Sequence, residues 1–149
     1  MSLKVGDTVP NFTAHDAFGN LFESQSVIGK KKVVIYFYPK DDTPQCTAQA
    51  CGFRDNYANF VALDVEVIGV SSDNVFSHQA FIKKYNLPFL LLSDSDKTIR
   101  KLFDVPSDYL GLLPGRATYL IDEKGIIQMI FDSVLGTKHV TKVLEKLMK

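Results

Sequence analysis

The pattern of apolar residues along the chain predicts its buried strands. Two unbroken apolar runs, at 33–38 and 65–70, fit strands that are covered on both faces, as in a parallel sheet. A shorter apolar run at 89–92 follows Pro88 and predicts a third strand of the same kind. The core of the sheet is therefore expected to come from these three segments.

Two pairs of shorter segments predict hairpins, because each pair flanks a turn sequence that contains glycine. The turns are Phe18-Gly19-Asn20 and Asp122-Glu123-Lys124-Gly125. The paired segments are 11–16 with 20–23 and 116–121 with 126–131. The stretch 105–115, which has two prolines and two glycines, is expected to be a loop.

Apolar residues at helical spacing predict four helices. Phe53, Tyr57 and Phe60 form the inward face of a helix that begins after Thr43. The other helices are expected at 74–85, 97–103 and 137–148. The side chains expected to point inward from the second and last of the four are Phe76, Ala80, Phe81 and Tyr85, and Val140, Val143, Leu144 and Leu147.

The element order β-β-β-α-β-α-β-α-β-β-α predicts an α/β fold. We expect a mixed central sheet flanked by helices on both faces, with an N-terminal β-hairpin extension. A chain of 149 residues suits a single domain spanning 1–149. Right-handed crossovers place the helix after Thr43 at the carboxyl end of a central strand.

Composition and charge narrow the function. Lys and Arg number 17 and so do Asp and Glu, so a net charge near zero argues against nucleic acid or an anionic membrane as the main partner. No apolar stretch reaches the length of a membrane span, and the N-terminus has no targeting pattern. We therefore expect a cytoplasmic protein. Two cysteines in a reducing compartment are more often catalytic or redox-active than a structural disulfide.

The first cysteine lies where its sulfur can be activated. Thr43 is suited to cap a helix and Pro44 to its first position, which makes Cys46 the third helical residue. Unpaired backbone N–H groups point outward there, and a thiol is deprotonated more easily at a helix N-terminus or beside a cation. The alternative is that Thr43 only caps the helix and Cys46 is a small buried apolar residue.

The second cysteine, Cys51, cannot reach the first within an intact helix. Positions five apart have Cα atoms ~8.6 Å apart in an α-helix, whereas a disulfide needs Cα atoms within roughly 7 Å. A Cys46–Cys51 disulfide would require the first turns to unwind. Gly52 would weaken the helix there, or it would allow close packing against a neighbour. Two cysteines are too few for a closed zinc site.

The pattern Pro39-x-x-x-Thr43-x-x-Cys46 resembles the active-site signature of the peroxiredoxins. Cys51, followed by Gly52-Phe53-Arg54-Asp55, resembles the bacterioferritin-comigratory or Q-type subfamily. The resemblance extends from Gly6-Asp7 through Tyr119-Leu120-Ile121-Asp122 to the C-terminal helix. It implies a thioredoxin-like fold and the reduction of hydrogen peroxide and organic hydroperoxides without a metal or organic cofactor, as part of antioxidant defence.

The resemblance also implies roles for five residues. Cys46 would be oxidised to a sulfenic acid, and Cys51 would resolve it as an intramolecular disulfide that thioredoxin or a similar dithiol reduces. Thr43 would hydrogen-bond the sulfur or the peroxide, and Pro39 would shield the thiolate. Arg116 would favour the thiolate and the leaving oxyanion. Relatives of this type suggest a monomer, with a weak dimer as the alternative.

Departures from the family pattern concern two places. Gln45 replaces the usual glycine before the first cysteine, which either narrows the pocket entrance or only alters its surface. The loop 106–114 lacks the Trp and the Lys-rich insertion of many bacterial members and looks more like the cyanobacterial and plastid branch. Its leucines, Leu110, Leu112 and Leu113, would pack on their own core, form an apolar lip for organic peroxides or contact another protomer.

Other polar residues receive plainer expectations. His15, His78 and His139 have no metal-ligand spacing, so we expect solvated or capping roles. Lys40, Asp41 and Asp42 are expected to be solvated in the loop before Cys46, with docking of a partner as the alternative. Arg54 and Asp55 would either pair with neighbours near the site or form an exposed helix face.

Three functions fit a thiol switch of this kind. The first is a thioredoxin-dependent peroxidase, the second a redox sensor that passes oxidation to a partner, and the third a general thiol–disulfide oxidoreductase. The peroxidase is favoured because Thr43, Pro39 and Arg116 would add oxyanion chemistry that plain disulfide exchange does not need.

Overall fold

The computed structural model describes residues 3–105, 107–108, 113–133 and 135–148, with the backbone alone at 107–108 and 113–114. The strands are β1 (Thr13–Asp16), β2 (Leu21–Glu23), β3 (Lys32–Phe37), β4 (Val65–Ser71), β5 (Leu90–Ser93), β6 (Ser107–Asp108), β7 (Leu113–Pro114), β8 (Ala117–Ile121) and β9 (Ile127–Asp132). The helices are η1 (Ser24–Ser26), α1 (Pro44–Asp55), α2 (Tyr57–Ala62), α3 (Val75–Tyr85), α4 (Thr98–Phe103) and α5 (Gly136–Leu147). Both predicted hairpins and all three predicted buried strands are present, with small shifts of their ends.

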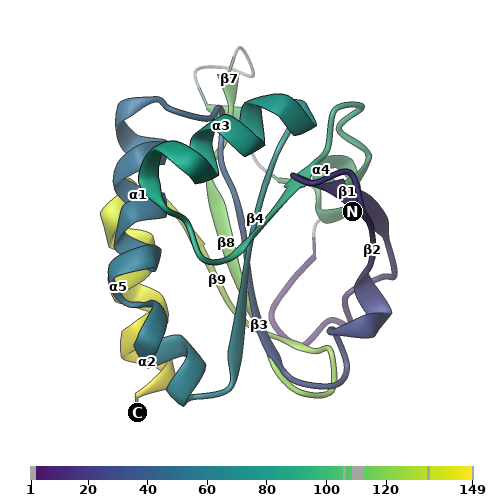
Figure 1. Cartoon of the computed structure of the whole chain (residues 1–149). Coiled ribbons are helices and arrows are strands. Elements are labelled where there is room, and N and C mark those ends of the chain that lie inside the picture. Colours follow the sequence, from purple (N-terminus) through teal and green to yellow (C-terminus); the bar gives the residue numbers. More distant parts are fainter. Residues whose placement is uncertain (1–2, 106, 109–112, 134, 149) are drawn as a thin grey trace.

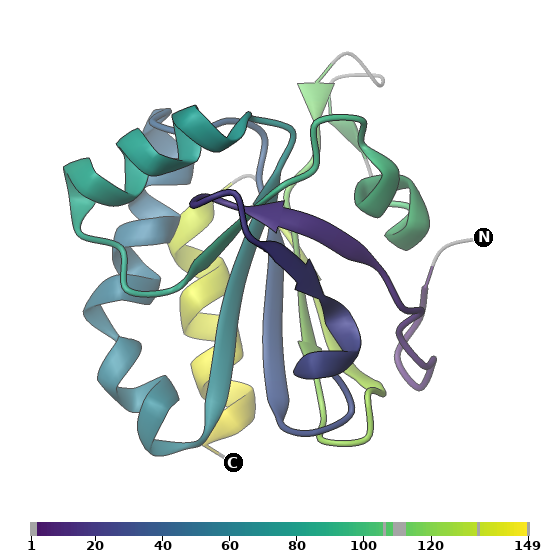
Figure 2. The same ribbon diagram turned by 45° about the vertical axis from the view of Figure 1, so that its right-hand side comes forward.

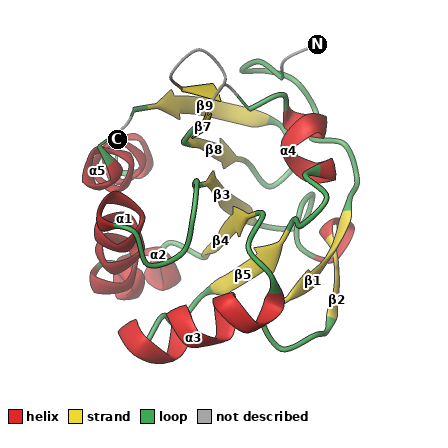
Figure 3. Cartoon of the chain, turned by 90° about the horizontal axis from the view of Figure 1, so that it is seen from above, coloured by secondary structure: helices red, strands yellow, loops and turns green. Residues whose placement is uncertain are grey.

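One seven-stranded mixed sheet runs through the molecule in the order β2-β1-β5-β4-β3-β8-β9 (Figure 3). The buried strands β3, β4 and β5 are parallel to one another, and β8 pairs antiparallel with β3. The N-terminal hairpin extends the sheet because β1 pairs antiparallel with β5, with His15 opposite Ser93. This confirms the expected mixed sheet with its hairpin extension.

The two faces of the sheet bury two separate cores. Alternate residues of β3 point to opposite faces, so Val33 and Ile35 join one apolar cluster while Val34 and Tyr36 join the other. Helix α4 covers the first face, and α1, α2, α3 and α5 cover the second (Figures 2 and 3). All of these β3 side chains are fully buried, as the unbroken apolar run requires.

Helix α1 begins at the carboxyl end of β3, where the chain leaves the sheet and turns back along its face (Figure 1). Thr43 is its N-cap and Pro44 its first residue, as predicted. The single long helix that we expected is interrupted at Asn56, whose backbone N–H and side-chain amide both donate to the carbonyl of Gly52. This local competition divides the helix into α1 and α2, although Phe53 and Phe60 still point inward.

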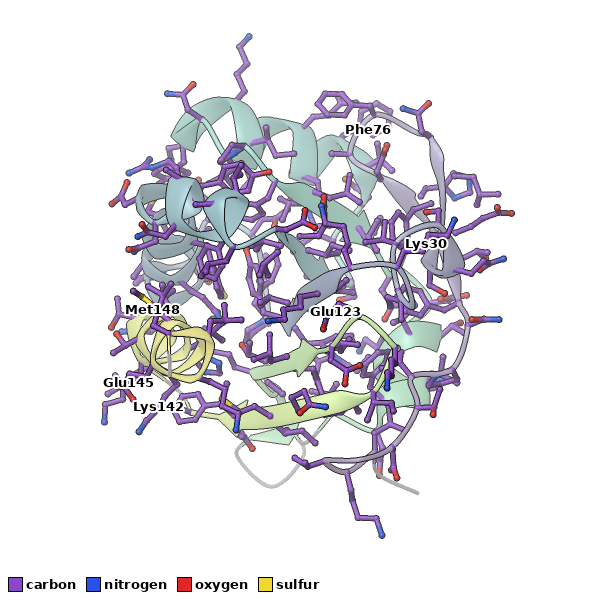
Figure 4. The ribbon with its side chains drawn as sticks, turned by 90° about the horizontal axis from the view of Figure 1, so that it is seen from below. Lys30, Phe76, Glu123, Lys142, Glu145 and Met148 are labelled. Atoms are coloured by element: carbon purple, nitrogen blue, oxygen red, sulfur yellow. The ribbon has the colours of Figure 1, made fainter. Side chains whose placement is uncertain are left out.

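Helix α3 faces the core differently from the prediction. Phe81 is buried and Tyr85 partly buried, but Phe76 is 77% exposed and Ala80 is also on the surface. Figure 4 shows the Phe76 side chain at the periphery of the molecule. The inward position one turn before Phe81 belongs instead to His78, which is fully buried because Asp41 of the loop before α1 and the Leu92 carbonyl of β5 satisfy its ring nitrogens.

Helices α1 and α5 lie side by side at close range (Figures 1 and 3). A Cβ atom on Gly52 would lie 3.0 Å from Val140 Cγ2. A Cβ on Gly136 would overlap the backbone carbonyl oxygen of Gln45. The structure thus gives Gly52 a packing role, which is one of the two roles considered from the sequence.

The connection before β8 contains a small ladder, since β6 and β7 pair antiparallel where the sequence predicted only a loop. Leu110 and Leu112, and the side chain of Leu113, lie outside the described residues, and with them the expected apolar lip. In the part of the chain that is described, no helix is long and apolar enough to span a bilayer.

Candidate active site

The sulfur of Cys46 lies against the guanidinium of Arg116. Cys46 is the third residue of α1 and is 1% exposed. Arg116 Nη2 donates to Cys46 Sγ over 3.2 Å, and the arginine is itself 4% exposed. The two residues meet because β8 pairs antiparallel with β3, which places the start of β8 beside the end of β3, with Ala117 opposite Phe37. A charged donor at this distance is not the environment of a purely apolar cysteine.

One nitrogen of the Arg116 guanidinium has no hydrogen-bond partner among the described residues. Its Nη1 donates a short hydrogen bond to Gln49 Oε1 and its Nη2 contacts the sulfur. Its Nε is buried and, among the described residues, has no hydrogen-bond partner. A buried N–H without a partner costs free energy, and an acceptor on a ligand or a reacting atom is one way to supply the missing hydrogen bond.

The structure corrects the expected helix-capping role of the Thr43 side chain. Thr43 occupies the N-cap position, but its hydroxyl donates to the carbonyl oxygen of Lys40 over 2.9 Å and makes no capping bond to α1. Pro39 follows the end of β3 and is partly buried. The turn 40–43 is thereby closed on itself just before the first turn of the helix.

Cys51 lies in the same uninterrupted helix as Cys46, and both thiols are free. Cys51 is partly exposed, in contrast to the buried Cys46. Because the two cysteines are five positions apart in a helix, their Cα atoms are ~8.6 Å apart, which is beyond disulfide range. The described conformation is therefore the one with two separate thiols that the spacing predicted.

Sequence reasoning missed Gln49, a fully buried amide at the centre of the site. Its Oε1 accepts from Arg116, and its Nε2 donates to Thr118 Oγ1 over 3.5 Å. The signal was present, since Gln49 lies three residues after Cys46 and shares its helix face. An amide on the inward face of a helix next to Ala50 and Phe53 needs a polar partner.

Two of the three histidines, His78 and His139, are buried in hydrogen-bond networks, which contradicts the expected solvated or capping roles. His139 lies on α5, where its Nδ1 is 2.7 Å from Thr118 Oγ1 and its Nε2 is 2.7 Å from the carbonyl oxygen of Ser133. The pKa of His139 is lowered to about 4, mainly by burial and to a smaller extent by the charge of Arg116, while the hydrogen bond to Ser133 opposes the shift. His15 is exposed, as expected.

The other buried histidine, His78, anchors the loop before Cys46. Asp41 is 7% exposed, not solvated as we expected, and accepts from Tyr38 Oη at 2.6 Å and Ser77 Oγ at 2.8 Å. His78 Nδ1 lies 2.7 Å from Asp41 Oδ2, and His78 Nε2 lies 2.9 Å from the carbonyl oxygen of Leu92. The turn before α1 is therefore tied to α3 and, through His78, to β5.

Asp41, Asp73 and His78 have ligand-type atoms within 4.8 Å of one another, a spacing that could hold a metal ion. Each group already has a hydrogen-bond partner: Asp73 Oδ2 accepts from the backbone N–H of Asp41 at 2.7 Å and from Ser71 Oγ at 2.7 Å. We therefore interpret the cluster as a polar network that supports the loop.

Two charged groups near the site, Asp42 and Arg54, pair with neighbours. Asp42 accepts from Lys84 Nζ at 2.8 Å, and this hydrogen bond lowers the pKa of Asp42. Arg54 donates to Asp55 Oδ1 at 3.0 Å and to the carbonyl oxygen of Tyr85 at 2.8 Å, which favours pairing over a bare exposed face. Lys40 is exposed, as expected.

Gln45, which departs from the family glycine, has a specific contact. Its side chain is exposed, yet its Oε1 accepts from the backbone N–H of Gly136 at 2.9 Å. Gly136 is the first residue of α5, and the N-cap residue Leu135 supplies no side-chain cap. Gln45 therefore supplies a hydrogen bond to the start of α5 from the neighbouring helix, a role that the sequence did not indicate.

The sequence model of the AhpC/TSA family matches residues 5–130 of this chain. Among curated proteins, "Peroxiredoxin Q, chloroplastic" of Populus jackii is 48% identical over 143 residues, covering 95% of this chain and 67% of that protein. The protein of the same name from Triticum aestivum is 48% identical over 141 residues, covering 94% of this chain and 64% of that protein. The chain thus spans about two-thirds of the length of these plant relatives.

Solved structures resemble the whole chain. Peroxidoxin BcpB of Mycobacterium tuberculosis superposes with a TM-score of 0.89 at 32% identity, covering 98% of this chain and 97% of that one. A cysteine mutant of PrxQ from Xylella fastidiosa superposes with a TM-score of 0.90 at 30% identity, covering 99% and 97%. These likenesses confirm the expected thioredoxin-like α/β fold.

Proposed function

Because the chain belongs to the AhpC/TSA family, as a peroxiredoxin of the Q type, we propose that Cys46 reduces hydrogen peroxide and organic hydroperoxides and that Cys51 completes the cycle. Family membership supports a thiol peroxidase, an oxidoreductase that acts on peroxide. The observation that carries the assignment of Cys46 is the 3.2 Å contact between its sulfur and Arg116 Nη2 at the first turn of α1. Cys51 lies further along the helix and is partly exposed, which suits a thiol that acts after the peroxide has reacted.

In the first step the Cys46 thiolate attacks the terminal oxygen of the peroxide. A sulfur–oxygen bond forms and the O–O bond breaks, so the sulfur loses two electrons and becomes a sulfenic acid. The leaving alkoxide or hydroxide takes a proton and departs as alcohol or water. The positive charge of Arg116 favours the thiolate, and its free Nε–H is available to an oxygen on which negative charge develops.

In the second step Cys51 attacks the sulfenic sulfur of Cys46. The S–S bond forms while the hydroxyl leaves as water with the proton of the Cys51 thiol. Since both residues lie in one continuous helix, part of α1 must unwind before the sulfurs can meet. As the family resemblance implies, Thr43 would hydrogen-bond the sulfur or the peroxide, and Pro39 would shield the thiolate from water.

In the third step a dithiol reductant of the thioredoxin type reduces the disulfide. Two electrons and two protons return the cysteines to thiols, and the reductant leaves as its own disulfide. The overall reaction converts one hydroperoxide and one dithiol into an alcohol, a water and a disulfide. The turn around the exposed Lys40 and Asp42 lies next to Cys46 in the chain and is the surface where the reductant would approach.

The deciding experiment couples peroxide consumption to NADPH oxidation through thioredoxin and thioredoxin reductase. We expect rapid NADPH oxidation with hydrogen peroxide and with alkyl hydroperoxides, and none with Cys46→Ser. Slow peroxide reaction with a stable mixed disulfide to another protein would favour the redox sensor. Reduction of insulin disulfides without peroxide turnover would favour a general oxidoreductase.

Two further expectations from the sequence remain proposals. We propose a cytoplasmic location, which cell fractionation with a compartment-specific marker tests, and a monomer, which light scattering coupled to size-exclusion chromatography tests. Recovery of the protein in an organelle fraction would contradict the cytoplasmic location. A mass twice the 16.7 kDa of one chain would contradict the monomer.

A further inference from the structure

A chain of hydrogen bonds connects the Cys46 sulfur to a buried histidine on α5. From the sulfur it runs through Arg116, Gln49 and Thr118 to His139. These groups come from α1, from the start of β8 and from α5, which meet beside one another in the fold. Each member is at most 4% exposed, so water cannot substitute freely for a missing partner.

His139 determines which group donates and which accepts along this series of hydrogen bonds. His139 Nε2 lies 2.7 Å from the carbonyl oxygen of Ser133, which can only accept, so Nε2 carries the ring proton. Burial lowers the pKa of His139 to about 4, so the ring is neutral near pH 7 and Nδ1 has a free lone pair. The Thr118 hydroxyl, 2.7 Å from Nδ1, must therefore donate its one proton to the histidine.

The donor role of the Thr118 hydroxyl in turn determines the orientation of the Gln49 amide. Once the Thr118 hydroxyl has donated to His139, its oxygen can only accept, which favours the amide nitrogen of Gln49 on that side, 3.5 Å away. The Gln49 carbonyl oxygen then faces Arg116, where it accepts from Nη1. The opposite orientation of the amide would set the Gln49 NH₂ group against the guanidinium, with two donors facing each other.

The orientation of Arg116 depends on this acceptor. With Nη1 held by Gln49, Nη2 points at the Cys46 sulfur and Nε is left free for the substrate. A guanidinium is planar and rigid, so rotation of one N–H away from its acceptor moves the others too. Loss of the Gln49 acceptor would therefore misplace both donors that serve the reaction.

We propose that Thr118 and His139 are positioning residues that act on Cys46 through Gln49 and Arg116, by fixing which end of the Gln49 amide faces the guanidinium. The proposal rests on the proposed peroxidase function and adds two residues that touch neither the sulfur nor the peroxide. The Phe131 ring, packed edge-on against His139 with centroids 4.8 Å apart, keeps the imidazole in place.

The first test is a matched pair of substitutions at Thr118. Thr118→Val preserves the shape but removes the hydroxyl, whereas Thr118→Ser retains it. The chain contains no tryptophan, so Cys46 oxidation by hydrogen peroxide is followed by quenched alkylation and mass spectrometry. We expect the second-order rate constant to fall about tenfold in Thr118→Val, equivalent to about 1.4 kcal/mol, and to stay within about twofold of wild type in Thr118→Ser.

A second pair at His139 keeps the proposal falsifiable if Thr118→Val folds poorly. His139→Asn retains an acceptor toward Thr118, and His139→Leu does not. We expect His139→Leu to slow Cys46 oxidation by a factor similar to that of Thr118→Val. His139→Asn should be intermediate or close to wild type. Thermal unfolding midpoints of all four variants separate a loss of stability from a loss of rate. If His139→Leu and Thr118→Val both react with peroxide as fast as wild type, the proposal is wrong.

A double-mutant cycle decides whether the effect passes through the arginine. In an Arg116→Ala background Thr118→Val should have no further effect on the rate, because the group being positioned is absent. A tenfold loss that persists without Arg116 would overturn the proposal.

A second readout separates this inference from the proposed function. The rate at which iodoacetamide alkylates Cys46 depends on the Arg116 contact whether or not the protein is a peroxidase. If wild type does not react with peroxide, the proposed function fails, and the alkylation rates of the same variants still decide the role of Thr118 and His139.

Discussion

The two ends of helix α1 are held by different forces. In its first turn, 44–47, only Cys46 is buried, and the turn is held by side-chain hydrogen bonds to other elements. In its second half Ala50 and Phe53 are fully buried in the core between the sheet and α5. One cysteine lies in each part, so the two sulfurs differ in how easily the backbone around them can move.

This difference indicates which cysteine would move in forming the proposed Cys46–Cys51 disulfide. Opening the first turn breaks a few hydrogen bonds, each with a net contribution of about 1 kcal/mol. Unwinding around Cys51 would draw Phe53 out of the core, and exposing a buried phenylalanine costs roughly 2–3 kcal/mol in transfer free energy alone. We infer that Cys46 moves toward Cys51, which stays with the packed half of the helix.

The largest effect is expected at Cys51. Cys51→Ser should abolish NADPH-coupled turnover with thioredoxin while Cys46 still undergoes one rapid oxidation, since no second thiol can displace the sulfenic hydroxyl. Mass spectrometry after stepwise addition of peroxide should find sulfenic, then sulfinic acid on Cys46. Full turnover in this variant would show that Cys51 is not the resolving cysteine.

The next effect is expected at Arg116, whose guanidinium contacts the Cys46 sulfur in the first turn of α1. Arg116→Ala should slow oxidation of Cys46 about 10²-fold, the scale typical for loss of one donor to a developing oxyanion. The matched control is Arg54→Ala. Arg54 lies on α1, the helix that carries Cys46, but it pairs with Asp55 and Tyr85 and not with Cys46. An unchanged rate in Arg116→Ala would remove this residue from the mechanism.

Acid should lower the free energy of unfolding of the protein through protonation of His139. Its pKa is about 4 in the folded protein against the ordinary histidine value of 6.5, so the unfolded state binds more protons between these values. This contribution to stability is complete above about pH 6.5 and is lost as pH falls toward 4. We expect urea unfolding at pH 4.5 to give a free energy about 2 kcal/mol lower than at pH 7 on account of this residue.

The control for this acid effect is His139→Asn, which has no imidazole to protonate. Its unfolding free energy should decline less between the same two pH values than that of wild type. Equal declines in both proteins would mean that other groups cause the acid sensitivity.

The smallest effect is expected at Gln45, which ties the first turn to α5. Gln45→Ala should speed formation of the Cys46–Cys51 disulfide about two- to fivefold, because loss of one hydrogen bond of about 1 kcal/mol eases opening of the turn. Gln45→Gly should be faster still, since glycine also disfavours the helix. Rapid quench after one equivalent of peroxide measures the rate. Slower disulfide formation in both variants would show that the tie promotes the step.

Short-range features of the site were predictable because they depend on neighbouring residues. Thr43 and Pro44 marked the start of α1, and this placed Cys46 in its first turn. The spacing to Cys51 predicted two thiols out of bonding range. Arg116 was found only through the family resemblance, since nothing near it in the sequence points to a cysteine 70 residues away.

Features that depend on side-chain orientation were predicted less well. Phe76 was expected to point inward, but His78 takes the buried face of α3 because Asp41 and the Leu92 carbonyl satisfy its two nitrogens. The spacing of apolar residues along a helix, from which its inward face was predicted, carries no information about such polar partners. The same holds for His139, whose burial depends on Thr118 and Ser133.

The sequence by itself determined the strands, the start of α1 and the separation of the two cysteines, because periodicity, capping and helix geometry act over a few residues. Only the tertiary structure decided what surrounds the sulfur. Pairing of β8 with β3 brings Arg116 to Cys46. Packing of α5 on α1 brings Gly136 to Gln45, and His139 of α5 reaches Thr118 of β8. Such contacts join residues that are far apart in the chain, so the topology of the sheet and the packing of helices on it select them.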